Sequence, residues 1–138
     1  MRSERCLPEA MLEHTFVHIP GVGAATERKL WEQGIVTWAD ALDLGACPVG
    51  FSDPRWGRSC RIIEQSLRSL DRQDHRHFAS ALSRSEHWRA WADFRRTVVY
   101  LDIETTGCSS SSEVTVVGLY DGARTQSFIA GDNLDQLP

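Results

Sequence analysis

Near Thr97 the hydrophobic pattern of this 138-residue chain switches from helical to extended. Upstream, apolar residues such as Ile63, Leu67 and Leu70 recur at intervals of three and four, which is typical of an amphipathic helix. Downstream, short runs rich in β-branched and aromatic residues predict strands. Since the two periods are incompatible within one element, we expect an α/β fold in which a helical leader precedes a sheet.

The upstream half predicts several helices. Good helix formers over 24–33 end at Gly34, a plausible C-terminal cap, and Thr37 is a good N-cap for a short second helix. A long amphipathic helix is expected from about Arg55 to Arg72, after a linker-like segment over 45–54. Two short helices follow, one around Phe78 and one that begins near Ser85.

The downstream half predicts three antiparallel strands. The run 98–101 has the composition of a strand buried on both faces. Residues 113–120 and 124–129 predict two further strands, and Asp121-Gly122 between them is a strong hairpin signal.

Charge divides the chain into three parts, although the formal net charge is only −4. Residues 55–96 carry ten basic and five acidic side chains, whereas 1–54 carry four and eight, and 97–138 carry one and six. We therefore expect a leader over 1–53, an arginine-rich helical segment over 54–96 and a sheet domain over 97–138.

Nothing in the sequence predicts secretion or a membrane partner. The start of the chain is polar, and no apolar run reaches the roughly 18 residues of a membrane helix. The four cysteines have neither paired nor metal-ligand spacing, so we expect a reduced, cytoplasmic protein. They are Cys6, Cys47, Cys60 and Cys108. We also expect no small organic cofactor.

Two histidine pairs have spacings that a metal could use. These are His14 with His18 and His75 with His77. Because no matched cysteine or carboxylate stands beside them, surface histidines are the favoured interpretation.

The sharpest motif is Asp102-Ile103-Glu104-Thr105-Thr106-Gly107, at the end of the first predicted strand. Residues two apart in a strand point to the same side, so Asp102 and Glu104 should present two carboxylates together. Paired hard oxygen ligands suit Mg²⁺ or Mn²⁺, and two such ions can promote phosphodiester hydrolysis. The alternative is a pair of exposed carboxylates where a strand reaches the surface.

This motif resembles the first motif of the DEDD exonucleases of the ribonuclease-H-like superfamily. From about His14 to Pro138 the chain also resembles the amino-terminal part of the bacterial YprB-type predicted exonucleases. The resemblance rests on four segments, namely 16–23, 55–96, 100–107 and 116–122, with Cys108 standing where a leucine is usual.

The resemblance implies a truncated ribonuclease-H-like mixed sheet, of which this chain carries the first three antiparallel strands. It implies that Asp102 and Glu104 are catalytic residues and ligands of two Mg²⁺ or Mn²⁺ ions. The activity implied is 3′–5′ exonucleolytic hydrolysis, with single-stranded nucleic acid as the expected partner. The family carries further carboxylates on later segments, so we expect this chain to be incomplete and inactive by itself. Three other acids do not match those motifs, namely Asp121, Asp132 and Asp135.

The segment Pro20-Gly21-Val22-Gly23 is a second motif, which resembles the turn of helix-hairpin-helix DNA-binding elements. A glycine turn that opens a helix leaves backbone N–H groups free for a phosphate. The expected nucleic-acid contacts are Gly21, Gly23, Thr26, Arg28 and Lys29. The alternative is an ordinary packing unit, with Leu30, Trp31 and Ile35 in the core in either case.

The arginines of the long predicted helix leave two interpretations open. They could follow a phosphate backbone, or they could form a solvated face. They are Arg55, Arg58, Arg61, Arg68 and Arg72. The alternative to a nuclease is therefore a noncatalytic nucleic-acid-binding or structural fragment, and the oligomeric state is not indicated.

Overall fold

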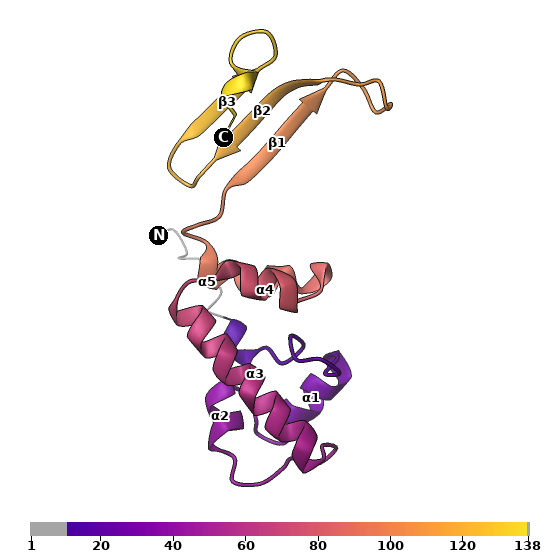
Figure 1. Ribbon diagram of the computed structural model, residues 1–138, viewed down its shortest axis with the longest axis vertical. Helices are drawn as coiled ribbons and strands as arrows, with labels where there is room; N and C mark the ends of the chain where they lie inside the picture. The colour runs from indigo at the N-terminus through magenta and orange to yellow at the C-terminus, as the bar shows by residue number, and fades with distance from the viewer. Residues whose placement is uncertain (1–10, 138) are drawn as a thin grey trace, which may run out of the picture. The chain divides into compact units, whose positions relative to one another are not determined.

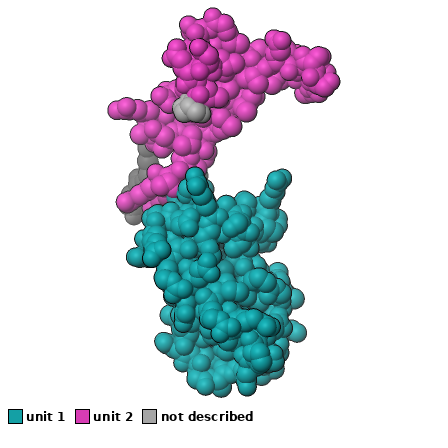
Figure 2. Space-filling model, in the orientation of Figure 1, with its two compact units in different colours: residues 1–94 teal, residues 95–138 magenta. Residues whose placement is uncertain are grey.

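Helices occupy the first part of the chain and a three-stranded antiparallel sheet the second, which confirms the predicted α/β class (Figure 1). The computed structural model describes residues 11–137, and Cys6 lies outside them. Figure 2 shows two units, residues 1–94 and 95–138, each described here by itself. The division falls close to the change of hydrophobic pattern at Thr97.

The helical unit follows the predicted pattern closely. The predicted helix that begins near Ser85 is a 3₁₀ helix that continues as one α-helical turn. The helices are η1 (Leu12–His14), α1 (Ala24–Glu32), α2 (Trp38–Asp43), α3 (Asp53–Asp71), α4 (His75–Ala81), η2 (Arg84–Ala90) and α5 (Trp91–Phe94).

Local capping sets the ends of the first two α-helices. Gly34 has a φ of 83°, and its N–H donates to the Trp31 carbonyl at 2.9 Å, so α1 closes with a left-handed residue. Thr37 and Asp40 form a capping box at the start of α2. The hydrogen bonds from the Thr37 side chain and backbone hold the pKa of Asp40 below its usual range.

Trp38 lies at the centre of the helical core. Its side chain is fully buried, its indole N–H donates to the Thr15 carbonyl at 2.7 Å, and its ring stacks on Phe78. Leu30 and Ile35 are buried as predicted, and Trp31 packs against the same core. Burial of these large side chains provides the main driving force for folding of this unit.

A buried ion pair crosses the helical unit. Glu27 of α1 is 1 % exposed, and its Oε2 lies 3.1 Å from Nη2 of Arg89 in η2. Its Oε1 accepts hydrogen bonds from the backbone N–H groups of Phe16 and Val17 at 2.6 and 3.2 Å. The carboxylate is therefore fully satisfied, as a buried charge must be.

His18 is buried, so the surface interpretation of this histidine is wrong. Its neighbours Val17 and Ile19 belong to the core, and its ring lies against Trp38 with centroids 5.2 Å apart. Neither ring nitrogen has a hydrogen-bond partner within the described part of the chain. Burial lowers the pKa of His18 to about 4 against the opposing effect of the nearby Thr15 backbone, and the charge of His77 adds a smaller lowering.

The sheet has the order β1-β2-β3, with β1 (Tyr100–Thr105), β2 (Val114–Tyr120) and β3 (Thr125–Ile129). The β2–β3 hairpin turns at Gly122, whose φ is 95°. The Asp121 side chain accepts the N–H groups of Ala123 and Arg124 at 2.9 and 2.7 Å. These backbone bonds lower the pKa of Asp121 and make it a turn residue.

The expectation that the first strand is buried on both faces is wrong for the described chain. Every residue of β1 is exposed, including Leu101 at 58 % and Ile103 at 49 %. β1 is an edge strand of a three-stranded sheet. A strand is buried on both faces only where other elements cover both faces of its sheet, so apolar composition alone does not produce burial.

Replacing Arg89 by methionine should destabilise the helical unit by about 3–5 kcal/mol, because the Glu27 carboxylate would stay buried without its counter-charge. Urea unfolding followed by tryptophan fluorescence measures this change. Glu86→Gln is the matched control, since Glu86 bonds Arg89 from the more exposed side of the pair. Equal losses in both variants would contradict a special role for the Glu27–Arg89 pair.

His18 should make the helical unit less stable in acid. The neutral ring is favoured in the fold, so its contribution is complete above the unfolded pKa of 6.5 and declines as pH falls towards about 4. We expect about 2 kcal/mol of unfolding free energy to be lost between pH 7.5 and pH 5 through this residue. His18→Leu should remove that part of the pH dependence, and an unchanged pH dependence in this variant would refute the assignment.

Candidate functional site

Asp102 and Glu104 lie on one face of β1. The register pairs Asp102 with Gly118 and Glu104 with Val116 in an unbroken antiparallel ladder, so the two side chains share a face while Ile103 occupies the other. Their Cα atoms are separated by two residues, roughly 6.6 Å along a strand. Both residues are exposed, and neither forms an ion pair with any residue in 11–137.

Gly118 leaves the surface beside Asp102 open. It stands directly across from Asp102 on β2, where most residues would place a side chain next to the carboxylate. A Cβ at this position would lie 3.8 Å from the Asp102 Cβ, an ordinary contact. Gly118 was not among the residues predicted for the site, although an isolated glycine within a strand pattern is itself a signal of close approach.

A β-bulge follows the acid pair immediately. The register shifts between Glu104 and Thr105, so Thr115 has no partner on β1. Beyond the bulge, Thr106 N–H donates to the Glu113 carbonyl, and Glu113 N–H donates to the Thr106 hydroxyl, both at 3.0 Å. The two threonines of the motif therefore hold the ends of the 106–113 loop together. They do not continue the row of side chains that contains Asp102 and Glu104.

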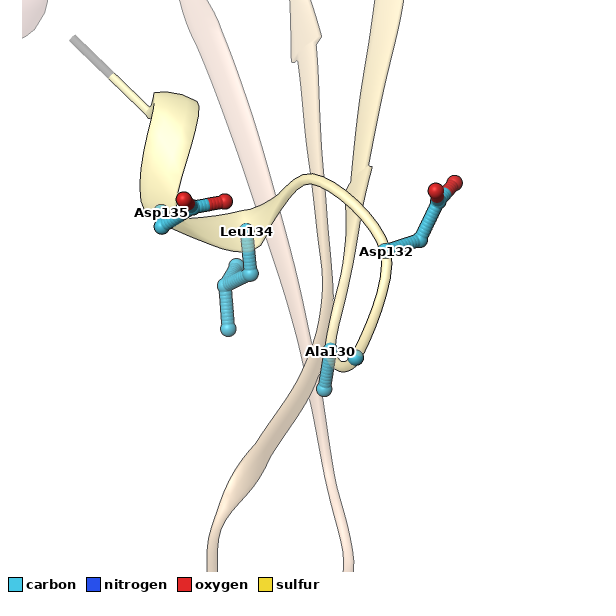
Figure 3. A pocket seen from close by; sticks show the side chains of 5 residues that line it. Ala130, Asp132, Leu134 and Asp135 are labelled. Atoms are coloured by element: carbon cyan, nitrogen blue, oxygen red, sulfur yellow. The ribbon is translucent and has the colours of Figure 1, made fainter.

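No third acid converges on Asp102 and Glu104 within the described residues. Indeed, no group of three or more His, Cys, Asp or Glu in that part of the chain could hold a metal ion. Asp121 is bound to its own turn, and Asp132 and Asp135 border a hollow beside β3 (Figure 3). None of these three acids joins Asp102 and Glu104 in a group of three potential ligands within residues 11–137.

The glycine turn at 20–23 packs against α3. Gly21 has a φ of 79°, and its carbonyl accepts a hydrogen bond from Nη2 of Arg55 at 2.7 Å. Gly23 is the N-cap of α1 and brings no side chain to the cap. The element before the turn is a single 3₁₀ turn, so only the helix after it is regular.

The other predicted contacts of this turn lie along α1. Thr26 is half-buried, whereas Arg28 and Lys29 are exposed. The structure thus brings Gly21 and Gly23 together at one end of α1, with Arg28 and Lys29 further along it. Glu27, the residue between Thr26 and Arg28, points into the core, whereas Glu32 is exposed one turn after Arg28.

The paired histidines do not form a metal site. His77 Nε2 lies 3.1 Å from the Ser66 hydroxyl, and His75 is exposed beside Phe94. None of the three described cysteines forms a disulfide, and they are Cys47, Cys60 and Cys108.

No known family, curated protein or solved structure matches the chain in the comparisons made. Among the helices of residues 11–137, none combines the length and apolar character that a bilayer-spanning helix needs.

Gly118→Ala should raise the unfolding free energy of the sheet by about 0.5–1 kcal/mol, since alanine costs less backbone entropy and its Cβ meets no clash. Amide hydrogen exchange of the β2 residues measures the change. Gly122→Ala is the control, because its φ of 95° should make the same substitution destabilising. Destabilisation by Gly118→Ala would show that the open face is required for folding.

Proposed function

We propose that this chain forms part of a metal-dependent nuclease in which Asp102 and Glu104 bind divalent cations. The reaction is phosphodiester hydrolysis of single-stranded nucleic acid, in the 3′–5′ direction that the ribonuclease-H-like resemblance suggests. One observation carries the proposal, namely that two unpaired carboxylates share an open face of one strand across from a glycine.

Electrostatics supports a cation at this position. Residues 97–138 contain six acidic side chains and one basic side chain, and the Asp102–Glu104 pair has no counter-charge in the described sheet. Two carboxylates held roughly 6.6 Å apart repel each other, and a bound cation relieves that repulsion. Oxygen donors from Asp and Glu are the ligands that Mg²⁺ and Mn²⁺ prefer.

The described residues supply only part of a ligand set. Asp102 and Glu104 can hold ions with water completing the coordination, but no third protein ligand joins them within residues 11–137. Bound ions would activate a water molecule and stabilise the leaving oxygen. We therefore expect weak cation binding by this pair alone and hydrolysis only when further ligands complete the site.

Gly118 keeps room for the substrate in this proposal. A phosphate oxygen must approach the ions from the open side of the acid pair, and on β2 the position across from Asp102 carries no side chain. Glu104 lies opposite Val116, which is half-buried, so the more open approach is on the Asp102 side.

Asp102→Asn should abolish Mn²⁺ binding at the sheet, because it removes half of the anionic charge and a ligand oxygen. Paramagnetic broadening of the amide resonances of 101–105 and 117–119 during an Mn²⁺ titration measures this. Asp132→Asn is the matched control, since it removes an exposed carboxylate of the same unit away from the pair. Unchanged broadening in Asp102→Asn, or none in the parent chain, would reject the proposal.

A further inference from the structure

The outer face of α3 carries a continuous row of arginines. Arg58, Arg61, Arg68 and Arg72 recur at intervals of three, seven and four, so at 100° per residue they fall on one narrow stripe. Gln65 fills the remaining position of the stripe. The buried residues Trp56, Ser59, Ile63 and Ser66 occupy the opposite side of this helix, the longest in Figure 1. The arginine stripe therefore lies on the side of α3 away from the core and is about 21 Å long.

The four stripe arginines form no ion pair within residues 11–137. All are exposed, and the ion pairs within 4 Å in residues 11–137 are those of Arg89, not those of α3. An ordinary solvated helix face alternates acids and bases at intervals of four. Here Arg58 and Arg61 are like-charged neighbours, and so are Arg68 and Arg72, while one exposed acid, Glu64, lies beside the middle of the stripe. An anion across the stripe relieves the repulsion within the two arginine pairs.

Arg55, which precedes the stripe on α3, differs from the stripe arginines because its side chain has partners within the helical unit. Its contacts define the structure at the amino-terminal end of the stripe. Arg55 donates to the Gly21 carbonyl and lies over the Phe51 ring, so it fixes the glycine turn on α3. Arg55 and the next arginine, Arg58, both border a groove of about 250 Å³ that lies between the glycine turn and α3. The groove is lined by Ile19, Pro20, Arg55, Arg58, Ser59 and Ile62.

We infer that the arginine stripe, with the groove at its amino-terminal end, binds the phosphate backbone of a nucleic-acid strand. Four guanidinium groups in a row match the repeated phosphates of one strand, and guanidinium forms paired hydrogen bonds to phosphate oxygens. The chain as a whole is acidic, so this binding comes from a local surface and not from net charge. It does not require the Asp102–Glu104 site.

An anionic membrane fits the stripe less well than a nucleic acid. A helix that lies in a bilayer surface exposes large apolar side chains beside its basic residues. The exposed large apolar residues of the described chain all lie outside α3. With no exposed large apolar side chain on α3 beside the arginines, their row is suited to a polyanion in water.

The test is binding of a fluorescent single-stranded oligonucleotide to the full chain in EDTA, over a range of salt concentrations. Four phosphate contacts predict a slope of about −2.8 in log K against log salt, which is an affinity loss of about 50-fold between 50 and 200 mM. Replacing the four stripe arginines by glutamine should abolish binding, and Arg61→Gln alone should reduce the slope by about 0.7.

The matched control replaces four exposed arginines that do not belong to the stripe, with the same change in charge, namely Arg76, Arg84, Arg96 and Arg124. It should retain binding, and equal loss in both quadruple variants would overturn the inference. Absence of binding at 50 mM salt, or binding to phosphatidylserine vesicles in place of the oligonucleotide, would also overturn it. Because EDTA removes divalent cations, binding under these conditions is independent of the proposed metal site, and its loss would not bear on that site.

Discussion

The Glu27–Arg89 ion pair joins the parts of the helical unit that are far apart in sequence. One carboxylate oxygen accepts the backbone N–H groups of Phe16 and Val17, and both oxygens contact the Arg89 guanidinium. The pair therefore links the segment before the glycine turn, helix α1 and helix η2. Because a buried charge is tolerated only with every partner in place, this constraint fixes the segment before the glycine turn and helix η2 against α1.

The position of the glycine turn follows from that constraint. Residues 16 and 17 are held by Glu27, and Gly21 is held from the other side by Arg55. The turn is thus a fixed element between α1 and α3, and the arginine stripe of α3 begins next to it. A surface for a polyanion gains from such rigidity, since fewer side chains need to be ordered on binding.

Local sequence patterns predicted the elements well but not their partners. Capping at Thr37, the stop at Gly34 and the period of α3 depend on residues close in sequence, so the helices were predictable. The Glu27–Arg89 pair spans 62 positions, and no local pattern indicates it. A signal existed at one end only, because Glu27 lies three residues before the buried Leu30 and so falls on the apolar face of α1.

Burial was the other quantity that the sequence predicted poorly. The apolar composition of β1 predicted a covered strand, and the residue type of His18 predicted a surface one, yet each has the opposite environment. Burial depends on which elements pack together, which composition does not contain. The Asp102–Glu104 pair was predictable because its geometry is set within one strand, whereas any further ligand depends on distant parts of a chain.

The bulge at Thr115 separates two parts of the sheet with different tolerance to change. On the side of the bulge that contains Asp102 and Glu104, the one-residue offset fixes the register of β1 against β2. A shift of one residue in that register would turn every side chain of a strand to the other face. On the far side, Thr106 and Glu113 clamp the serine-containing loop through mutual hydrogen bonds. Insertions or deletions between these two clamp residues can therefore accumulate during evolution while the carboxylates keep their alignment.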